Sequence, residues 1–212
     1  MKGIKELKTF YKNQSDQDCL KICTTTAITQ IILIRHARPI ISPKSFVTFE
    51  DAERHLTEYR NSSVYADFRS PICTEELTDV PIYHSDLQRS KETAMKLFPP
   101  ELFKLEEDAR FRELDRQNLK LPFKMPYKIH TALSRIAWLT GKMKYIELPK
   151  EAWKRLKGNA NYLDALAQKE KVLIIVAHGF HNFFVSRFLK RLGYRLVNNG
   201  GHKHLSVNIW AR

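Results

Sequence analysis

The stretch Ile31-Ile32-Leu33-Ile34-Arg35-His36-Ala37-Arg38-Pro39 joins an unbroken aliphatic run to a group of cations around one imidazole. Aliphatic side chains without polar alternation predict a strand covered on both faces, as in a mostly parallel sheet flanked by helices. Such sheets bind ligands beyond the carboxyl ends of their strands. Because Arg35, His36 and Arg38 follow that end, we expect an imidazole among fixed positive charges, which is a setting suited to an oxyanion.

The size and composition of the chain predict a single domain over residues 1–212. At 212 residues and 43% hydrophobic content it can bury a substantial core, and no linker-like stretch or internal repeat divides it. No apolar run approaches the roughly 20 residues of a membrane-spanning helix. The charged start, residues 1–7, lacks the apolar segment of a secretory signal. We therefore expect a cytoplasmic protein without a membrane span.

The formal charge of +13 is the strongest signal in the composition. Such a charge is compatible with nucleic acid, an anionic membrane surface, acidic small substrates or simply a basic surface. The Lys and Arg residues are scattered, and no RNA-binding or helix-turn-helix signature is present. We interpret the charge as a basic surface and do not expect a nucleic-acid partner.

The three cysteines, Cys19, Cys23 and Cys73, are an odd number without a C-x-x-C motif. This pattern argues against a disulfide framework and against a zinc knuckle. We interpret them as small buried apolar side chains and expect no metal site.

Two further predicted strands end in polar residues. Val172–Ala177 is fully apolar and is followed by His178-Gly179, and Pro81–His84 is followed by Ser85, a plausible helix N-cap. Arg89 would then lie in the first turn of that helix, near the positive end of its dipole. The remaining pattern predicts helices near 4–11, 48–60, 85–98, 127–139, 151–167 and 180–192, and a final strand at an edge of the sheet over 205–210.

Strands that alternate with helices predict an α/β fold, a three-layer α/β/α sandwich with a mostly parallel central sheet. That fold would gather Arg35-His36, Ser85 with Arg89, and His178-Gly179 at one edge of the sheet. Each group alone has an ordinary structural interpretation, since a histidine after a strand commonly makes a structural hydrogen bond and a serine commonly caps a helix. All three together favour a phosphate site.

At this point the sequence resembles the histidine phosphatase superfamily, the phosphoglycerate-mutase-like proteins, in the branch of small bacterial phosphatases. The resemblance spans roughly Ile31 to Trp210. Its landmarks are, in order, the R-H pair Arg35-His36, the S-D-L-x-R-S-x-x-T-A segment from Ser85 to Ala94, the R-E-L segment from Arg112 to Leu114, and the V-A-H-G segment from Val176 to Gly179.

The resemblance implies a role for each matched residue. His36 would be the nucleophile that takes the phosphoryl group, with Arg35, Arg89 and His178 holding the phosphate oxygens, and Glu113 would protonate the leaving alcohol. The chemistry fits, because nearby Arg charges favour a neutral imidazole and present donors that match phosphoryl oxygens. We expect a raised pKa for Glu113 from a partly apolar pocket, and no cofactor. Further pocket candidates are Arg38, Ser42, Ser85 and Gly179.

The chain departs from the family pattern in three places. Ala37 stands where a glycine is common, and Pro39 and Ser42 stand where many members carry hydroxyl and amide residues, so we do not expect the phosphate contacts of that loop to follow the family. After Glu113, residues 115–118 replace a usual glycine and tryptophan, which puts a mutase activity in doubt and suits a phosphatase.

The predicted activity is that of a phosphomonoesterase, a phosphoric monoester hydrolase of the histidine acid phosphatase type. A phosphoglycerate-type mutase and a catalytically silent module that binds phosphorylated ligands remain alternatives. The substrate is a phosphorylated small molecule or a phosphoprotein, and the sequence does not indicate the oligomeric state. We expect specificity to lie in two insertions, 40–71 and 119–149, and residues 1–30 to form a helical extension.

Overall fold

A six-stranded sheet forms the centre of the protein. The computed structural model describes residues 2–14, 18–42, 44–77, 79–115, 117–143 and 147–212. The strand order is β6-β5-β8-β2-β10-β9; the first four strands are parallel, and β10 is antiparallel to both of its neighbours. The strands are β6 (Leu105–Glu107), β5 (Ile82–His84), β8 (Val172–Ala177), β2 (Gln30–Arg35), β10 (Val207–Ala211) and β9 (Arg195–Asn199).

The two apolar strands, β2 and β8, lie side by side at the centre of this sheet. In β2, Ile31 and Leu33 face one hydrophobic core, while Ile32 and Ile34 face the other, and all four are fully buried. Burying an aliphatic side chain of this size contributes roughly 1.5–3 kcal/mol. The absence of polar alternation in this stretch therefore follows from the strand's position between two cores.

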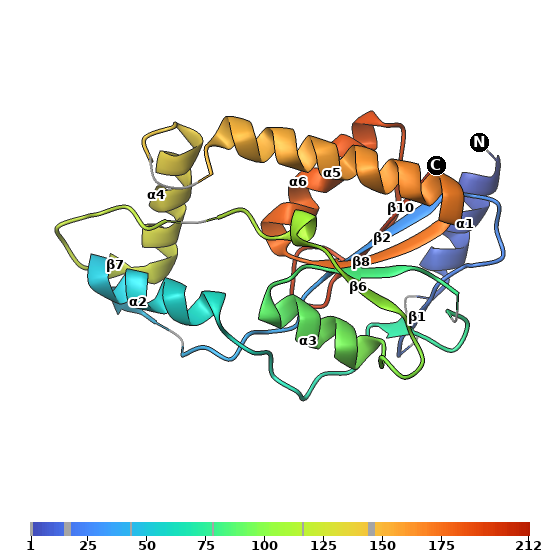
Figure 1. The fold of residues 1–212 in the computed structure, drawn as a ribbon, viewed down its shortest axis with the longest axis horizontal. Coiled ribbons are helices and arrows are strands. Elements are labelled where there is room, and N and C mark those ends of the chain that lie inside the picture. The colour runs from blue at the N-terminus through green and yellow to red at the C-terminus, as the bar shows by residue number, and fades with distance from the viewer. Residues whose placement is uncertain (1, 15–17, 43, 78, 116, 144–146) are drawn as a thin grey trace.

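Helices cover both faces of the sheet and make three layers, as the sequence predicts (Figure 1). Helices α5 (Pro149–Glu170) and α6 (Gly179–Arg191) pack on one face, and α1 (Lys2–Lys12) and α3 (Gln88–Leu97) pack on the other. No helix in the described ranges is both long and apolar enough to cross a bilayer.

A second group of elements lies at one end of the molecule, at the left of Figure 1. Helix α2 (Phe49–Arg60) begins with a capping box between Thr48 and Asp51, and α4 (Tyr127–Leu139) follows strand β7 (Met125–Pro126). Strand β7 pairs with β3 (Phe46–Val47). The two segments in which we placed substrate specificity are thus joined to each other by a small sheet.

The place of one strand and the start of one helix differ from the prediction. The final strand, β10, is not at an edge, because the short and partly polar strand β9 pairs with its outer side. Helix α3 begins at Gln88 with Leu87 as its N-cap residue, so Ser85 does not cap it. Ser85 is fully buried, and its hydroxyl instead contacts His178, as described below.

The cysteine interpretation was wrong for two of the three residues. Cys19 and Cys73 form a disulfide across 54 residues, while Cys23 is free. The bond lies beside the parallel pairing of β1 (Leu20–Lys21) with β4 (Ile72–Cys73). An odd cysteine count could not reveal this pairing, because it depends on two short strands without a periodic signal.

Between β6 and β7 the chain forms the 3-10 helix η1 (Ala109–Phe111).

Candidate active site

The predicted polar groups meet at the carboxyl edge of three parallel strands. Arg35, at the end of β2, is in register with Ala177 of β8, and His84 of β5 is in register with Val176. The chain therefore leaves all three strands at the same level. His36 and His178, which are 142 positions apart in the sequence, have ring centroids 5.1 Å apart.

His36 has the protonation state of a nucleophile. Its Nδ1 lies 2.7 Å from the carbonyl oxygen of Ala37, and a carbonyl can only accept, so Nδ1 carries the proton and Nε2 keeps a lone pair. Burial lowers the pKa of His36 well below its usual value, and the nearby charges of Arg89 and Arg35 lower it further. The ring is therefore neutral at pH 7.

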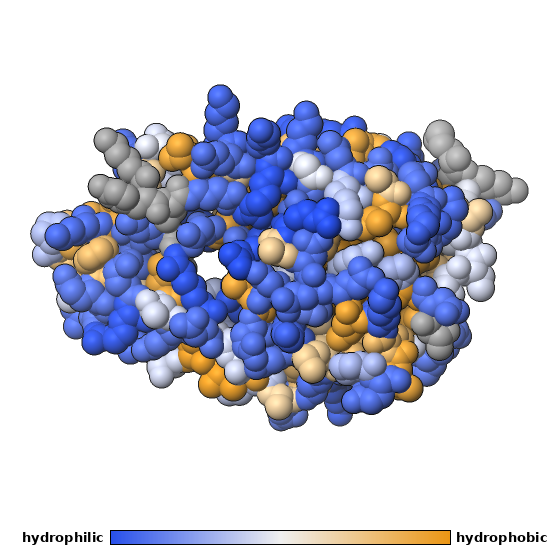
Figure 2. Space-filling view, viewed as in Figure 1, coloured by the Kyte–Doolittle hydropathy of each residue, from blue (hydrophilic) through white to orange (hydrophobic). Residues whose placement is uncertain are grey.

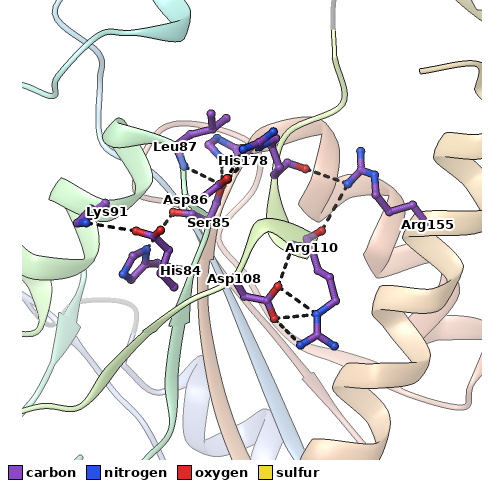
Figure 3. Close-up of polar contacts among 11 residues, drawn as sticks. His84, Ser85, Asp86, Leu87, Lys91, Asp108, Arg110, Arg155 and His178 are labelled. Atoms are coloured by element: carbon purple, nitrogen blue, oxygen red, sulfur yellow. Dashed lines mark hydrogen bonds and ion pairs between the residues drawn. The ribbon is translucent and has the colours of Figure 1, made fainter. Parts of the chain in front are cut away.

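His178 contacts Ser85 as well as the ring of His36. Its Nε2 lies 2.9 Å from the hydroxyl oxygen of Ser85, and that oxygen accepts the N–H of Leu87 at 3.3 Å (Figure 3). Burial, followed by the effects of His36 and Arg89, lowers the pKa of His178 well below its usual value. The Nδ1 of His178 is buried and has no hydrogen-bond partner among the described residues. That nitrogen is the one left to contact a ligand.

Arg89 is a buried cation fixed by helix α2. Its side chain is only 2% exposed, and Nη1 donates to the carbonyl oxygens of Tyr59, at 3.3 Å, and Arg60, at 3.4 Å. These carbonyls lie at the C-terminal end of α2, the negative end of the helix dipole, which offsets part of the cost of burying the charge. The guanidinium also lies over the Tyr59 ring, 4.5 Å from its centroid.

Arg35 lies against the start of α6. Its Nη1 donates to the carbonyl oxygen of His202, and its Nε is buried without a hydrogen-bond partner among the described residues. A Cβ at Gly179 would lie 3.2 Å from the Cζ of Arg35. A side chain at position 179 would therefore require the Arg35 guanidinium to move by a few tenths of an ångström.

A cavity of about 1240 Å³ opens onto this site. Arg35, Arg89 and Glu113 line it, together with parts of α2, α4, α5 and α6. The space-filling view is hollowed between the end that holds α2 and α4 and the rest of the molecule (Figure 2). The cavity is lined by more arginines than carboxylates. The carboxylates are Glu113, Asp115 and Glu147, and the arginines are Arg35, Arg60, Arg89, Arg112, Arg135 and Arg155.

Glu113 lies in the wall of this cavity but has a polar setting. Its carboxylate accepts the backbone N–H groups of Phe180, at 3.2 Å, and His181, at 2.9 Å, in the first turn of α6, and that of Leu114 at 3.0 Å. Glu113 therefore caps the N-terminus of α6, and the partly apolar pocket that we expected around it stays a prediction. Its role as an acid stays a prediction.

The other candidates divide into two groups. Ser85 contacts His178, and Gly179 lines the cavity. Arg38 is exposed with its guanidinium over the Tyr65 ring, 5.6 Å from its centroid, and Ser42 is also exposed. Neither Arg38 nor Ser42 is among the residues that line the cavity, where Ile41 stands instead.

Two neighbours of His36 could not be predicted from the sequence. The ring of His204 lies 5.2 Å from that of His36, and its Nδ1 is 3.2 Å from the His36 carbonyl oxygen. Burial and the Arg35 charge lower the pKa of His204 to about 4. Within the described ranges, no three His, Cys, Asp or Glu side chains group as metal ligands would.

The second neighbour is Tyr59, whose hydroxyl lies 3.5 Å from Nε2 of His36. It comes from the last turn of α2, within the insertion 40–71. No motif surrounds Tyr59 in the sequence, and only the fold of the insertion brings it to the site.

The buried histidines predict a loss of stability in mild acid. His36, His178 and His181 all have a lowered pKa, that of His181 falling to about 4 because of burial. Below about 6.5 the unfolded chain binds protons that the folded protein does not, so each such group lowers the free energy of unfolding by roughly 1.4 kcal/mol per pH unit. We expect full stability above pH 6.5 and a steep decline from pH 6.5 to 5.

Denaturant unfolding at several pH values checks this expectation. His181→Gln should make the decline shallower, because Gln does not titrate. His202→Gln, at an exposed position, should leave the slope unchanged. A free energy of unfolding that is constant between pH 6.5 and 5 would contradict the neutral state of these rings.

Comparisons with known proteins agree with this geometry. The family model of the histidine phosphatase superfamily (branch 1) matches residues 70–211, which is more than half of the chain. The matched residues begin after Arg35-His36. The strand that ends in Arg35, β2, nevertheless lies between β8 and β10, which are both within the match. No curated protein matches the sequence.

Similar solved structures have the same fold at low sequence identity. A mycobacterial glucosyl-3-phosphoglycerate phosphatase is 17% identical with a TM-score of 0.52, covering 77% of this chain and 80% of its own. A phosphoserine phosphatase from Entamoeba histolytica is 16% identical with a TM-score of 0.50, covering 85% and 89%. With its phosphoglycerate-mutase-like α/β/α sandwich, the chain belongs to branch 1 of the histidine phosphatase superfamily.

Proposed function

We propose that the protein is a phosphomonoesterase that works through a phosphohistidine on His36. The observation that supports this most strongly is the buried pair His36 and His178, 5.1 Å apart, with Arg35 and Arg89 beside it. In the first step, Nε2 of His36 would attack phosphorus while the bond to the leaving alcohol breaks. In the second, water would attack the phosphohistidine, releasing inorganic phosphate and returning the lone pair to Nε2.

The surrounding charges support phosphoryl transfer in particular. The transferring group spreads negative charge over three oxygens, so that donors already fixed in place contribute most of the catalysis. Arg35 and Arg89 are proposed to supply guanidinium N–H groups, and Nδ1 of His178 is proposed to contact a third oxygen. A nucleophile with a lowered pKa stays neutral below pH 6.5, which supports the finer assignment to the acid phosphatase type.

Glu113 is proposed to give its proton to the leaving alcohol and to take one from water in the second step. We expect Glu113→Gln to lower kcat/KM for an alkyl phosphate about a hundredfold, since general acid catalysis contributes roughly 10²–10⁴-fold. The same variant should keep nearly the normal kcat/KM for p-nitrophenyl phosphate, because that constant covers only the steps up to departure of the alcohol and this leaving group needs no proton, whereas kcat also includes the second step. The amide oxygen of Gln can still accept one N–H of α6, which protects the fold.

Steady-state rates on both esters decide the role of Glu113. An equal fall in kcat/KM on both esters would show that Glu113 acts only by holding α6. A fall in Tm together with the fall in rate would show the same. Asp115→Asn, at the next carboxylate along the cavity wall, is a matched charge control.

The substrate is proposed to be a phosphorylated small molecule that carries further negative charge. An excess of arginine over carboxylate in a 1240 Å³ cavity supports this class. Substrate specificity is proposed to depend on the insertions 40–71 and 119–149, which supply α2 and α4 to the cavity wall. We propose that residues 1–212 form one domain, of which residues 1–30 are an extension. Residues 43 and 144–146 of the insertions lie outside the described ranges.

The comparisons do not favour the mutase alternative, since the similar structures are phosphatases by name. A panel of sugar phosphates, nucleotides, phosphoamino acids and phosphopeptides, assayed for free phosphate with wild type and His36→Ala, tests the proposal. Phosphate release by wild type alone supports a hydrolase. Transfer to a second hydroxyl without release would indicate a mutase, and binding without turnover would indicate a silent module.

The proposed location is the cytoplasm, on the basis of the sequence alone. The Cys19–Cys73 disulfide opposes it, because disulfides persist mainly in oxidising compartments.

A further inference from the structure

Tyr59 separates His36 from the cavity. The nucleophile has no exposed surface and does not line the cavity, whereas Tyr59 does. The phenol oxygen of Tyr59 lies 3.5 Å from Nε2 of His36. A phosphate ester that enters from the cavity therefore meets Tyr59 before it reaches the nitrogen it must react with.

The position of Tyr59 is fixed by groups that belong to the site. Its carbonyl oxygen accepts from Nη1 of Arg89 and from the hydroxyl of Ser62, at 2.9 Å, and its ring lies beneath the Arg89 guanidinium. The next residue, Arg60, forms an ion pair of 2.6 Å with Asp115. Tyr59 is thus held in a fixed relation to the arginine that we propose as a phosphate ligand.

The direction of the hydrogen bond defines the chemistry. Because Nδ1 of His36 donates to Ala37, Nε2 can only accept, so Tyr59 must be the donor of the O–H···N contact. A phosphoryl group bonded to Nε2 needs the space on that side of the ring. The phenol then has to move aside, and its O–H group will lie next to a phosphoryl oxygen.

We propose that Tyr59 is a further catalytic residue, whose hydroxyl occupies the phosphoryl position in the free enzyme and donates a hydrogen bond to the transferring phosphoryl group. The inference rests on the proposed function of His36. It assigns to α2 a direct part in the chemistry, in addition to its part in the cavity wall. It also explains why the nucleophile is fully buried.

Tyr59→Phe tests this role, because it removes one oxygen and keeps the ring under Arg89 and the backbone carbonyl. We expect kcat/KM for p-nitrophenyl phosphate to fall about tenfold, the effect of losing a hydrogen bond to a charged group. Inhibition by vanadate, an oxyanion that can take the geometry of the transferring group, should weaken by a similar factor. Tyr65→Phe, at an exposed tyrosine outside the cavity, should change neither value.

Each outcome has one meaning. A Tyr59→Phe enzyme as active as wild type, or more active, would overturn the proposal, and greater activity would show that Tyr59 only blocks His36. Tyr59→Leu, which also removes the ring beneath Arg89, should lose more activity than Tyr59→Phe. If wild type releases no phosphate, the proposed function fails, and the vanadate-induced shift in Tm of wild type against Tyr59→Phe still tests the contact.

Discussion

Replacing His36 with alanine is expected to lower kcat/KM for every phosphate ester by at least about 10⁴-fold, as loss of a covalent nucleophile does. The variant removes the only proposed acceptor of the phosphoryl group. Its folding should be intact, because the imidazole that is removed is neutral, so that its loss leaves no unpaired charge buried. Free-phosphate assays, with Tm measured in parallel, check both expectations.

A His36→Ala enzyme that keeps a tenth of the wild-type rate, with a normal Tm, would remove His36 from the chemistry. His178→Ala provides the comparison within the pair. It should be damaged less, because His178 holds an oxygen and forms no bond to phosphorus. A loss at His178 that exceeds the loss at His36 would reverse the proposed roles.

Replacing Arg89 with methionine is expected to lower kcat/KM by about 10²–10³-fold, the range seen when a donor to developing charge is removed. Methionine has a similar length and no charge, so that no unpaired group stays buried on this side chain. The carbonyl of Tyr59 keeps the Ser62 hydroxyl as a donor. The protein should therefore fold, and the loss should appear in the rate and in phosphate affinity.

Arg89→Lys keeps the charge but not the planar pair of donors, so its rate should lie between wild type and Arg89→Met. Arg38→Met is the matched control, because Arg38 is an exposed arginine close to the nucleophile in sequence but outside the cavity wall. Its kcat/KM should stay within about twofold, because an exposed side chain outside the site usually contributes little to stability or activity. An Arg38→Met loss as large as that of Arg89→Met would contradict the geometry of the site.

The sequence predicted the centre of the fold because β2 and β8 are buried on both faces, and burial leaves a continuous aliphatic run. The approach of His36 to His178 followed from the same feature. Parallel neighbours end at one edge of a sheet, so polar residues just after both strands must meet there. Arg89 could be placed because its segment carries a motif as well as a helical pattern.

The missed features depend on segments without a periodic signal. Tyr59 reaches His36 only through the packing of an insertion, and His204 reaches it from the loop between β9 and β10. Two of the backbone partners of Glu113 belong to α6, 67 and 68 residues later in the chain, and no motif indicates that contact. The Cys19–Cys73 bond likewise joins the residue before β1 to the last residue of β4, and no pattern predicts either of these short strands.

Rapid acid-free quenching of the protein during turnover of a radiolabelled aryl phosphate tests the role of His36 most directly. We predict label that is lost in acid and stable in alkali, on the peptide that contains His36, and absent from His36→Ala. Turnover with no label on the protein, or with label on any other residue, would contradict a phosphohistidine at His36.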